Sequence, residues 1–407
     1  MKNLKLLVVA LVAMFGFIAC EQHECNDYDH SADLVGTWTC LQEGYAEALV
    51  IKADGSALST GHDGEEFWEN VAGSFVVENG MVTMTFEDGD NFHGHFDIIP
   101  GMAFSIYTDE GNRFTFNYCK EDLSEEVVGM WVCNDAPAGA DNDMAIISYE
   151  EDGSTTFTGI LPDKDGYMLK VNTTYKVVGD LVFKKNAVQG DSNNSNYISS
   201  RLTYVPNGTA AGDIMVYKHY NGKKEVSSSY LRIKQYLELP GNSYNYSNIY
   251  VTNAKAKEAE IEFAGQTFNL ATISGDFLDK MMKNILFNVS FPSADKIVYN
   301  CYINGENVNM PSPIVVEGNK MTIKKSAYNS VYKDIEVWTF QDQDNTQMHM
   351  YMPVKSFENF LANTAVEMKV KKGELDLNNT EAISAIYNGV ANAIETINVS
   401  FIFKTAK

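Results

Sequence analysis

The chain of 407 residues carries a formal net charge of -23, with 45% hydrophobic and 12% aromatic residues. This length predicts two to four domains, and the apolar content gives each of them enough material for a core, which excludes disorder as the state of the whole chain. The acidic balance, with no basic stripe interleaved with aromatic residues, excludes nucleic acid as a partner.

The N-terminus has the charge and length pattern of a secretory signal peptide. Lys2 and Lys5 precede an apolar run over residues 6–18, and small Ala19 and then Cys20 follow it. A run of roughly 13 residues is too short to cross a bilayer as a helix. We therefore expect a signal peptide over residues 1–19. A secreted protein with a free Cys20 is the plain alternative to the lipoprotein described next.

Phe17-Ile18-Ala19-Cys20 resembles the lipobox of bacterial lipoproteins, with Phe17 where Leu is usual. The resemblance implies lipidation of Cys20 and an anchor in the outer membrane, because two or three acyl chains hold a protein stably. Residues 20–33 are polar and predict a tether without a core. Acidic residues follow the cysteine, as in Bacteroidetes lipoproteins exported to the cell surface, although a merely soluble leader has the same composition: Glu21, Glu24, Asp27 and Asp29.

A six-residue frame occurs twice and indicates a duplicated domain. Val35-Gly36-Thr37-Trp38-Thr39-Cys40 is answered by Val128-Gly129-Met130-Trp131-Val132-Cys133, which predicts units over residues 34–125 and 126–236. Both units contain short alternating segments separated by turn residues such as Asp-Gly and Asn-Gly, which is typical of β-hairpins. An up-and-down barrel leaves no exposed sheet edges, so we expect two small antiparallel β-barrels.

The Gly-x-Trp motif on each first strand resembles the lipocalin (calycin) signature, and residues 33–236 look like the lipocalin-like domains of Bacteroidetes lipoproteins. The resemblance implies that each Trp closes one barrel end against an Arg from a late strand. A ligand-stacking role for the two indoles is the alternative. Repeats of this length leave room for barrels filled by their own side chains. The matching positions are Gly36, Trp38 and Arg113 in the first repeat, and Gly129, Trp131 and Arg232 in the second.

The cysteines do not form a complete disulfide framework, since five remain once Cys20 is set aside. A bridge between Cys40 and Cys119 is compatible with a closed barrel, whose first and last strands are neighbours. That register would separate Trp38 from Arg113, and of the two contacts we prefer the one between Trp and Arg. Cys133 matches Cys40 without a partner, which favours a buried thiol that acts as a small hydrophobe.

Residues 237–407 predict a third, β-rich unit. The residue pattern of the first two repeats ends near Pro240-Gly241, and no third Gly-x-Trp motif follows. Helical spacing appears over residues 277–286, with Ser274 as N-cap, and again over 356–363 and 380–394. The strand candidates, together with a hairpin signal at Asn304-Gly305, indicate a divergent barrel with helices against it.

Four patterns could carry chemistry, and each has a plainer interpretation. His93 and His95 share one strand face as a metal pair would, but an outward polar face, with Phe92 and Phe96 turned inward, explains the pattern. Residues 163–166 and 342–345 resemble fragments of calcium loops but lack the further carboxylate, so we interpret them as loop tips. Met348, Met350 and Met352 could offer thioethers to Cu(I), while core packing is the ordinary role of alternating methionine. Tyr244, Tyr246 and Tyr250 could form a platform for glycans, or belong to an edge strand or linker.

The sequence shows no nucleophile elbow, His-Glu-x-x-His, Cys-x-x-Cys or phosphate loop, so we predict no enzyme, no metal and no cofactor. Our hypothesis is an outer-membrane lipoprotein, facing the cell surface or the periplasm. It would bind a small apolar or amphiphilic ligand or act as an interaction scaffold. A cell-surface glycan- or protein-binding, adhesin-like module is the alternative. A hydrolase with a distant carboxylate pair is a third hypothesis. Ligand identity, oligomeric state and the hollowness of the barrels stay open.

Overall fold

The computed structural model describes residues 30–405 except 79, 90, 109–110, 134–143, 161–167, 186–196, 210–211, 264–265 and 304–305. The predicted signal peptide, Cys20 and most of the predicted tether lie outside these residues. The chain divides into two compact units. One is built from the first repeat, and the other contains residues 121–407 with two short segments, 41–46 and 62–67.

The first repeat forms a closed barrel of eight strands in sequence order. A short 3-10 helix, η1 (His30–Leu34), precedes it. Pairing of β1 with β8 closes the cylinder, and alternate residues such as Val82 and Met84 are buried inside it. The strands are β1 (Gly36–Gln42), β2 (Tyr45–Ile51), β3 (Ser56–His62), β4 (Phe67–Glu78), β5 (Met81–Phe86), β6 (Asn91–Ile99), β7 (Ala103–Tyr107) and β8 (Arg113–Cys119).

The second repeat has the same topology. Its turn at Asp152, like the turn at Asp54 in the first repeat, is held by a carboxylate oxygen that accepts from a backbone N–H two residues later, at 2.9 Å in both. The strands are β9 (Gly129–Cys133), β10 (Met144–Tyr149), β11 (Ser154–Ile160), β12 (Met168–Val178), β13 (Leu181–Lys185), β14 (Tyr197–Thr209), β15 (Gly212–Asn221) and β16 (Lys224–Ile233). The barrel closes between β9 and β16.

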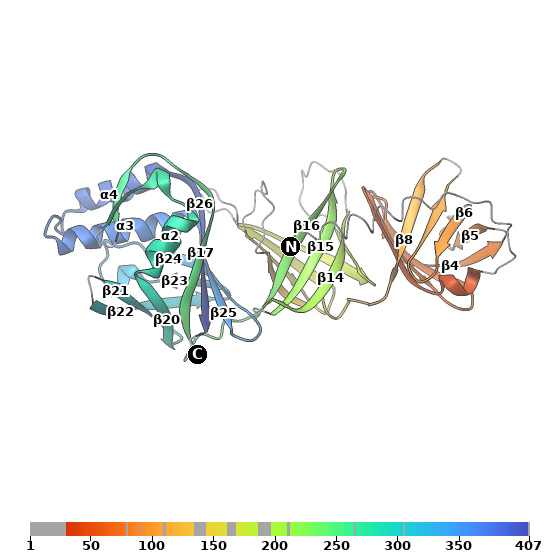
Figure 1. Ribbon diagram of the computed structural model, residues 1–407, viewed down its shortest axis with the longest axis horizontal. Helices are drawn as coiled ribbons and strands as arrows, with labels where there is room; N and C mark the ends of the chain where they lie inside the picture. Colours follow the sequence, from red (N-terminus) through yellow and green to blue (C-terminus); the bar gives the residue numbers. More distant parts are fainter. Residues whose placement is uncertain are drawn as a thin grey trace, which may run out of the picture. The chain divides into compact units, whose positions relative to one another are not determined.

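Residues 243–405 form a third closed barrel, again of eight strands in sequence order (Figure 1). Its strands are β17 (Ser243–Ala256), β20 (Leu286–Ser293), β21 (Lys296–Ile303), β22 (Glu306–Glu317), β23 (Lys320–Ile323), β24 (Ile335–Gln341), β25 (Gln347–Met352) and β26 (Ile394–Thr405). The predicted fold class, mainly β with tandem small antiparallel barrels and few helices, is confirmed.

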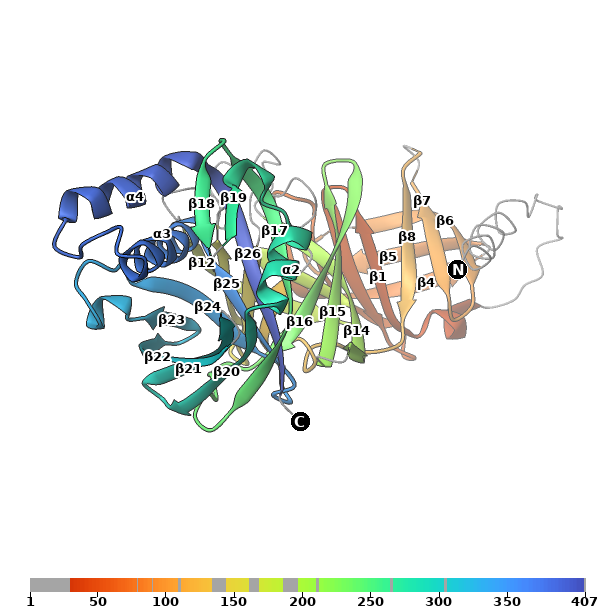
Figure 2. The ribbon, with the colours of Figure 1, turned by 60° about the vertical axis from the view of Figure 1, so that its left-hand side comes forward.

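Two insertions distinguish the third barrel. Between β17 and β20 lie the hairpin β18 (Glu260–Phe263) and β19 (Gln266–Asn269), the 3-10 turn η2 (Leu270–Thr272) and the helix α2 (Gly275–Lys283). A further 3-10 turn, η3 (Lys325–Ala327), follows β23. Between β25 and β26 lie α3 (Val354–Lys371) and α4 (Thr380–Ala393), side by side at one end of the barrel (Figure 2). Within the described residues, these helices are too short or too polar to cross a membrane.

The helix α3 is longer than the segment 356–363 that the sequence predicts. It continues through Thr364 and Val366, because packing against the barrel outweighs their weak helix propensity. It ends where Gly373 takes a left-handed conformation, at φ 73°, with its N–H donating to Val370. The predicted N-cap of α2 is confirmed, since Ser274 Oγ accepts from the Phe277 N–H at 3.3 Å.

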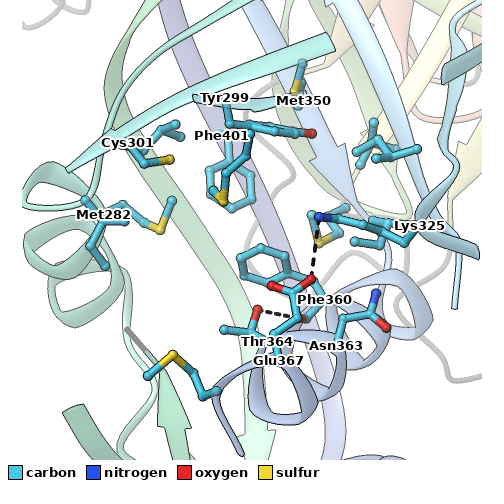
Figure 3. Close-up of a pocket in the computed structure, with 18 of the residues that line it drawn as sticks. Met282, Tyr299, Cys301, Lys325, Met350, Phe360, Asn363, Thr364, Glu367 and Phe401 are labelled. Carbon is cyan, nitrogen blue, oxygen red and sulfur yellow. Dashed lines mark hydrogen bonds and ion pairs between the residues drawn. The ribbon is translucent and has the colours of Figure 1, made fainter. Parts of the chain in front are cut away.

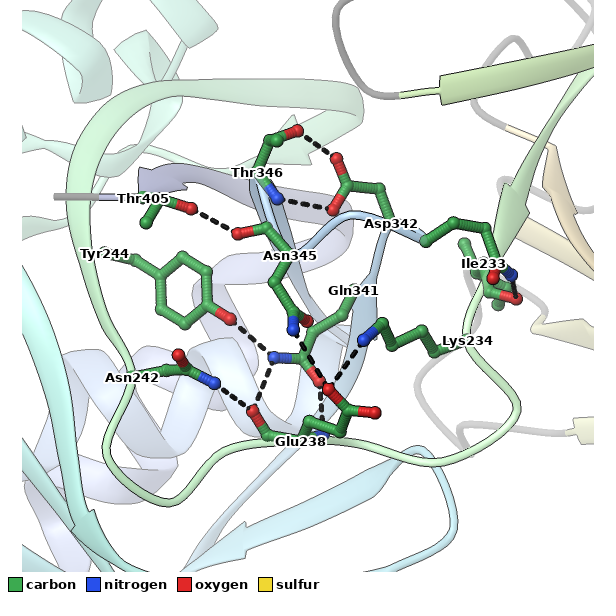
Figure 4. A network of polar contacts seen from close by, with 11 residues as sticks. Ile233, Lys234, Glu238, Asn242, Tyr244, Gln341, Asp342, Asn345, Thr346 and Thr405 are labelled. Atoms are coloured by element: carbon green, nitrogen blue, oxygen red, sulfur yellow. Dashed lines mark hydrogen bonds and ion pairs between the residues drawn. The ribbon is translucent and has the colours of Figure 1, made fainter. Parts of the chain in front are cut away.

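The segment that joins the second and third barrels is fastened to the turn between β24 and β25 (Figure 4). The buried Gln341 amide donates to the Glu238 carbonyl at 3.0 Å and to the Tyr244 hydroxyl at 2.5 Å, and its oxygen accepts from the Glu238 N–H at 2.5 Å. Lys234 reaches the Glu238 carboxylate at 2.6 Å. This region is an ordered junction.

Asp342, the first residue of the second calcium-like fragment, is 1% exposed. Its carboxylate accepts from both the backbone and the hydroxyl of Thr346, and its backbone bridges Ile233. Burial raises its pKa. The carboxylate therefore closes the turn between β24 and β25. Gln343 and Asp344 of this turn are exposed, so the loop-tip interpretation of the segment is confirmed, although Asp342 itself is buried. The other fragment, 163–166, lies outside the described residues.

Candidate functional site

Each of the first two barrels holds its motif tryptophan in a fully buried position. Trp38 and Trp131 are both 0% exposed. Each indole N–H donates to the carbonyl four residues earlier, Leu34 for the first and Val127 for the second, at 2.7 Å in both cases. The identical bond follows from the identical frame. An enclosed indole with a satisfied N–H has no face free for stacking a ligand.

The second barrel brings Arg232 to Trp131. The two residues are paired across β9 and β16, and the guanidinium carbon lies 5.0 Å from the indole centroid. Arg232 Nη2 donates to the carbonyls of Val128 at 2.6 Å and Glu126 at 3.2 Å, and Nη1 lies 3.6 Å from Asp213. The guanidinium thus ties the last strand to the segment that precedes the first.

The first barrel does not bring Arg113 to Trp38, and the expected contact is wrong there. Trp38 pairs with Tyr118, whereas Arg113 pairs with Tyr107 and lies with its guanidinium carbon 5.5 Å from that ring. Five residues of strand separate positions 113 and 118, which is about 17 Å. Tyr118 occupies the place that Arg232 has in the second barrel, with its ring 5.0 Å from the indole in an edge contact.

The glycine of the motif has a physical reason in both barrels. Gly36 has φ 140° and Gly129 has φ 124°, values that favour glycine. A Cβ on Gly36 would lie 2.6 Å from the Tyr118 ring, so the ring lies directly on the glycine. At Gly129 the nearest atom would be Arg232 Nε, at 3.6 Å.

Cys40 and Cys119 are buried and are not joined by a disulfide, so the bridge considered from the sequence is wrong. Cys119 pairs with Thr37, three residues from Cys40 along β1. That offset is about 10 Å of strand, beyond the reach of a disulfide.

The histidine pair lies on an outward face. His93 and His95 of β6 are exposed, while Phe96 of the same strand is 8% exposed. His93 Nδ1 lies 2.8 Å from the Thr83 hydroxyl. Across the part of the chain that the structure describes, no three His, Cys, Asp or Glu side chains meet as a metal site requires. The polar-face interpretation accounts for the pattern.

The three tyrosines of β17 do not share a surface, so the glycan platform is wrong. Tyr244 is 0% exposed, and Tyr246 is partly buried, with its hydroxyl donating to Asp279 at 2.9 Å. Tyr250 is 59% exposed. The pairing of β17 with β26 shifts after Tyr246, and this irregularity turns Tyr250 to the opposite side.

The third barrel contains an apolar cavity of about 160 Å³ (Figure 3). Alternate residues of its strands form the wall, because every second side chain of a barrel strand points inward. Met350 and Met352 of β25 belong to it, and Met348 of the same face is fully buried. The wall includes Leu286, Tyr299, Cys301, Met310, Ile323, Ile335, Val337, Phe401 and Phe403, with Met282 and Ile285 from the α2 region.

One face of α3 closes the cavity. Phe360, Thr364, Glu367 and Lys371 recur at the spacing that places residues on one side of a helix, and Asn363 and Met368 flank them. The opposite faces of α3 pack into the core through side chains such as Leu361. The helix therefore supplies most of the polar side chains of a lining that is otherwise mainly apolar.

The charged groups of the lining gather at α3. Lys325 Nζ of η3 lies 3.9 Å from Glu367 Oε1, and the exposed Lys371 lies one turn further along the helix. Burial raises the pKa of the Cys301 thiol to about 11, an effect that the nearby Lys325 charge partly offsets. The thiol is therefore protonated at neutral pH and contributes apolar surface, not a nucleophile.

The sequence did not single out this cavity. The alternation of Met348, Met350 and Met352 was a visible signal, as was the helical stripe from Phe360 to Lys371, yet neither indicates that the two meet around a void.

No family model and no curated protein matches this sequence. Among solved structures, the chain is similar to the isotype 1 transferrin binding protein B from serogroup B Neisseria meningitidis, with 10% sequence identity and a TM-score of 0.20. The match covers 89% of this chain and 66% of that chain, so this chain spans slightly under two thirds of its length. A match of this quality supports no inference about function.

Proposed function

We propose that the protein is a non-enzymatic lipoprotein of the outer membrane, anchored through Cys20, whose third barrel binds a small apolar or amphiphilic ligand. The lipocalin-like first and second barrels serve as the scaffold that carries it. The lipobox-like segment and the Gly-x-Trp motifs support a lipoprotein of the Bacteroidetes type.

The cavity under α3 is the observation that carries this proposal. Its volume of about 160 Å³ is close to that of an engineered apolar cavity of about 150 Å³ that binds benzene. Five methionines line it, namely Met282, Met310, Met350, Met352 and Met368. Flexible thioether side chains adapt to the shape of an apolar guest, which favours binding over a void that stays rigid and empty.

The non-enzymatic part of the proposal is supported by the chemistry of the lining. A protonated Cys301 is a poor nucleophile, and Oε1 of the Glu367 carboxylate is paired with Lys325 Nζ at 3.9 Å. This set suits binding better than proton transfer.

Methyl NMR tests the ligand site directly. The full chain with Cys20→Ser, labelled with ¹³C at the methionine methyl groups, is titrated with benzene and with 1-hexanol. We expect chemical-shift changes at the methyl groups of the five lining methionines and unchanged signals from Met81 and Met84 of the first barrel. Single Met→Leu variants assign each signal to its residue. Shifts confined to other methionines would refute the placement.

A variant that fills the cavity provides a second test of the ligand site. Val337→Phe adds volume to the lining from a residue that is 1% exposed, and Val315→Phe is the matched control because it is 45% exposed on the same barrel. We expect the first variant to lose binding and the second to keep it. Binding that survives Val337→Phe would place the ligand elsewhere.

The anchor has its own test. Mass spectrometry of the mature N-terminus should find an acylated Cys20, and Cys20→Ser should move the protein from the membrane fraction to the soluble fraction. An unmodified Cys20 after cleavage would contradict the lipoprotein assignment and leave the ligand site untouched.

A further inference from the structure

The polar side chains of the cavity divide into those that the protein already uses and those that remain for a ligand. The Asn363 amide donates to the Lys333 carbonyl at 2.8 Å and accepts from the Lys333 N–H and the Tyr387 hydroxyl. The Thr364 hydroxyl donates to the Phe360 carbonyl at 2.9 Å. The charged groups Lys325, Glu367 and Lys371 remain, together with the Tyr299 hydroxyl and the Cys301 thiol.

The pair formed by Lys325 and Glu367 is loose. At 3.9 Å it is longer than a charge-assisted hydrogen bond, which joins its atoms at about 2.7–2.9 Å. An ammonium group has three donors, so Lys325 keeps capacity for a second oxygen acceptor. Its side chain is 19% exposed, and in such a position water screens a charge less than at the surface. In Figure 3 the ammonium points toward Glu367, and Tyr299 and Met350 are drawn on its other side.

The balance of charge at the cavity differs from that of the whole chain. The protein carries a formal charge of -23, while the lining has two lysines against one carboxylate. A small, singly charged anion gains at Lys325, whereas an extended anionic surface is repelled by the rest of the molecule. A cationic head would have to compete with Lys325 for Glu367.

The volume of the apolar part of the cavity limits the length of the ligand's hydrocarbon chain. A volume of about 160 Å³ equals roughly five water volumes of about 30 Å³, and a methylene group is close to one such volume. We propose that the third barrel selects straight-chain monocarboxylates of about six carbons in all, about five of them in the apolar chain. The carboxylate would lie on Lys325 and the chain among Met350, Met352 and Phe401. This inference rests on the proposed ligand-binding function.

Calorimetry with matched ligands tests the head group. The full chain with Cys20→Ser is titrated at neutral pH with hexanoate, 1-hexanol and hexylamine, which share the chain and differ in charge. Hexanoate should bind about tenfold or more tightly than 1-hexanol, as expected for a hydrogen bond to a charged group. Lys325→Met should abolish this ratio and preserve 1-hexanol binding. Lys320→Met changes a half-buried lysine of the same barrel, outside the cavity lining and paired with Glu336 at 2.9 Å, and should change neither.

A chain-length series tests the tail. From butanoate to hexanoate the affinity should rise about fourfold per methylene, the value expected for burying about 0.8 kcal/mol. It should level off once the cavity is filled, between hexanoate and octanoate.

The outcomes separate this inference from the function on which it rests. Equal binding of hexanoate and 1-hexanol, or tighter binding of hexylamine, would overturn the carboxylate selectivity and leave the apolar ligand site intact. Binding of none of the three, together with unchanged methionine methyl signals, would overturn both. The ratio of hexanoate affinity to 1-hexanol affinity is measured on the protein with native Lys325. It therefore stays informative even where the Lys325 variant folds poorly.

Discussion

Alanine at the motif glycines of the first two barrels should have unequal costs. Both glycines require a positive φ, so Gly36→Ala and Gly129→Ala each introduce backbone strain of about 1–3 kcal/mol. Only the first adds a steric conflict, because its Cβ would lie 2.6 Å from the Tyr118 ring, whereas the second meets Arg232 at 3.6 Å.

The size of the difference follows from this contact. Forcing an extra methyl group into a packed site costs about 1–3 kcal/mol. Gly36→Ala should therefore destabilise the first barrel by about 1–3 kcal/mol more than Gly129→Ala destabilises the second. Gly212→Ala controls for φ alone, since Gly212 has φ 119° with no atom within 4 Å of its Cβ.

Hydrogen exchange with mass spectrometry measures the two barrels separately within the full chain, because peptides from each one report its own opening free energy. The double variant Gly36→Ala with Tyr118→Val should recover the steric part, which gives a coupling energy of about 1–3 kcal/mol. Equal costs at the two glycines, or a coupling near zero with Tyr118, would refute the role assigned to this ring.

Three further predictions concern the second and third barrels. Arg232→Leu should destabilise the second barrel by about 2–4 kcal/mol through lost charged hydrogen bonds, whereas the exposed Arg113→Leu should cost under about 1 kcal/mol, both measured by exchange. Burial lowers the pKa of His349 to about 4, below its unfolded value of about 6.5, so the unfolded chain binds the proton more readily. The stabilisation that His349 contributes above about pH 6.5 should fall by about 1 kcal/mol by about pH 5.5. Urea titrations of His349→Phe should show a pH slope smaller by that amount, because burial also lowers the pKa of His62 and His219, which keep their share of the slope. Tyr244→Ala should cost about 3–5 kcal/mol in the third barrel and Tyr250→Ala under about 0.5 kcal/mol, and similar costs would contradict their assigned burial.

Local patterns in the sequence predicted much of the fold. The repeated frame around Trp38 and Trp131 marked two equivalent units, and the turn residues between short alternating segments marked antiparallel hairpins. These features depend on neighbours in the chain, such as the carbonyl four residues before each Trp, so they are visible without the tertiary structure.

Local sequence patterns could not predict which residue contacts each tryptophan. Arg113 and Arg232 both lie on last strands, which made them look equivalent, but the register of closure places Tyr118 where the second barrel has Arg232. That register joins residues about 80 to 100 positions apart, and it depends on the stagger of all the strands between them.

The candidate site shows the same division. The sequence by itself determined that this chain forms β-hairpins, that it is duplicated, and that methionine and helical stripes occur near its end. Only the tertiary structure decided that α3 closes the third barrel over a void and that Lys325 meets Glu367 there. A cavity is the difference between the space that the strands enclose and the volume that their side chains fill, and no short segment carries that difference.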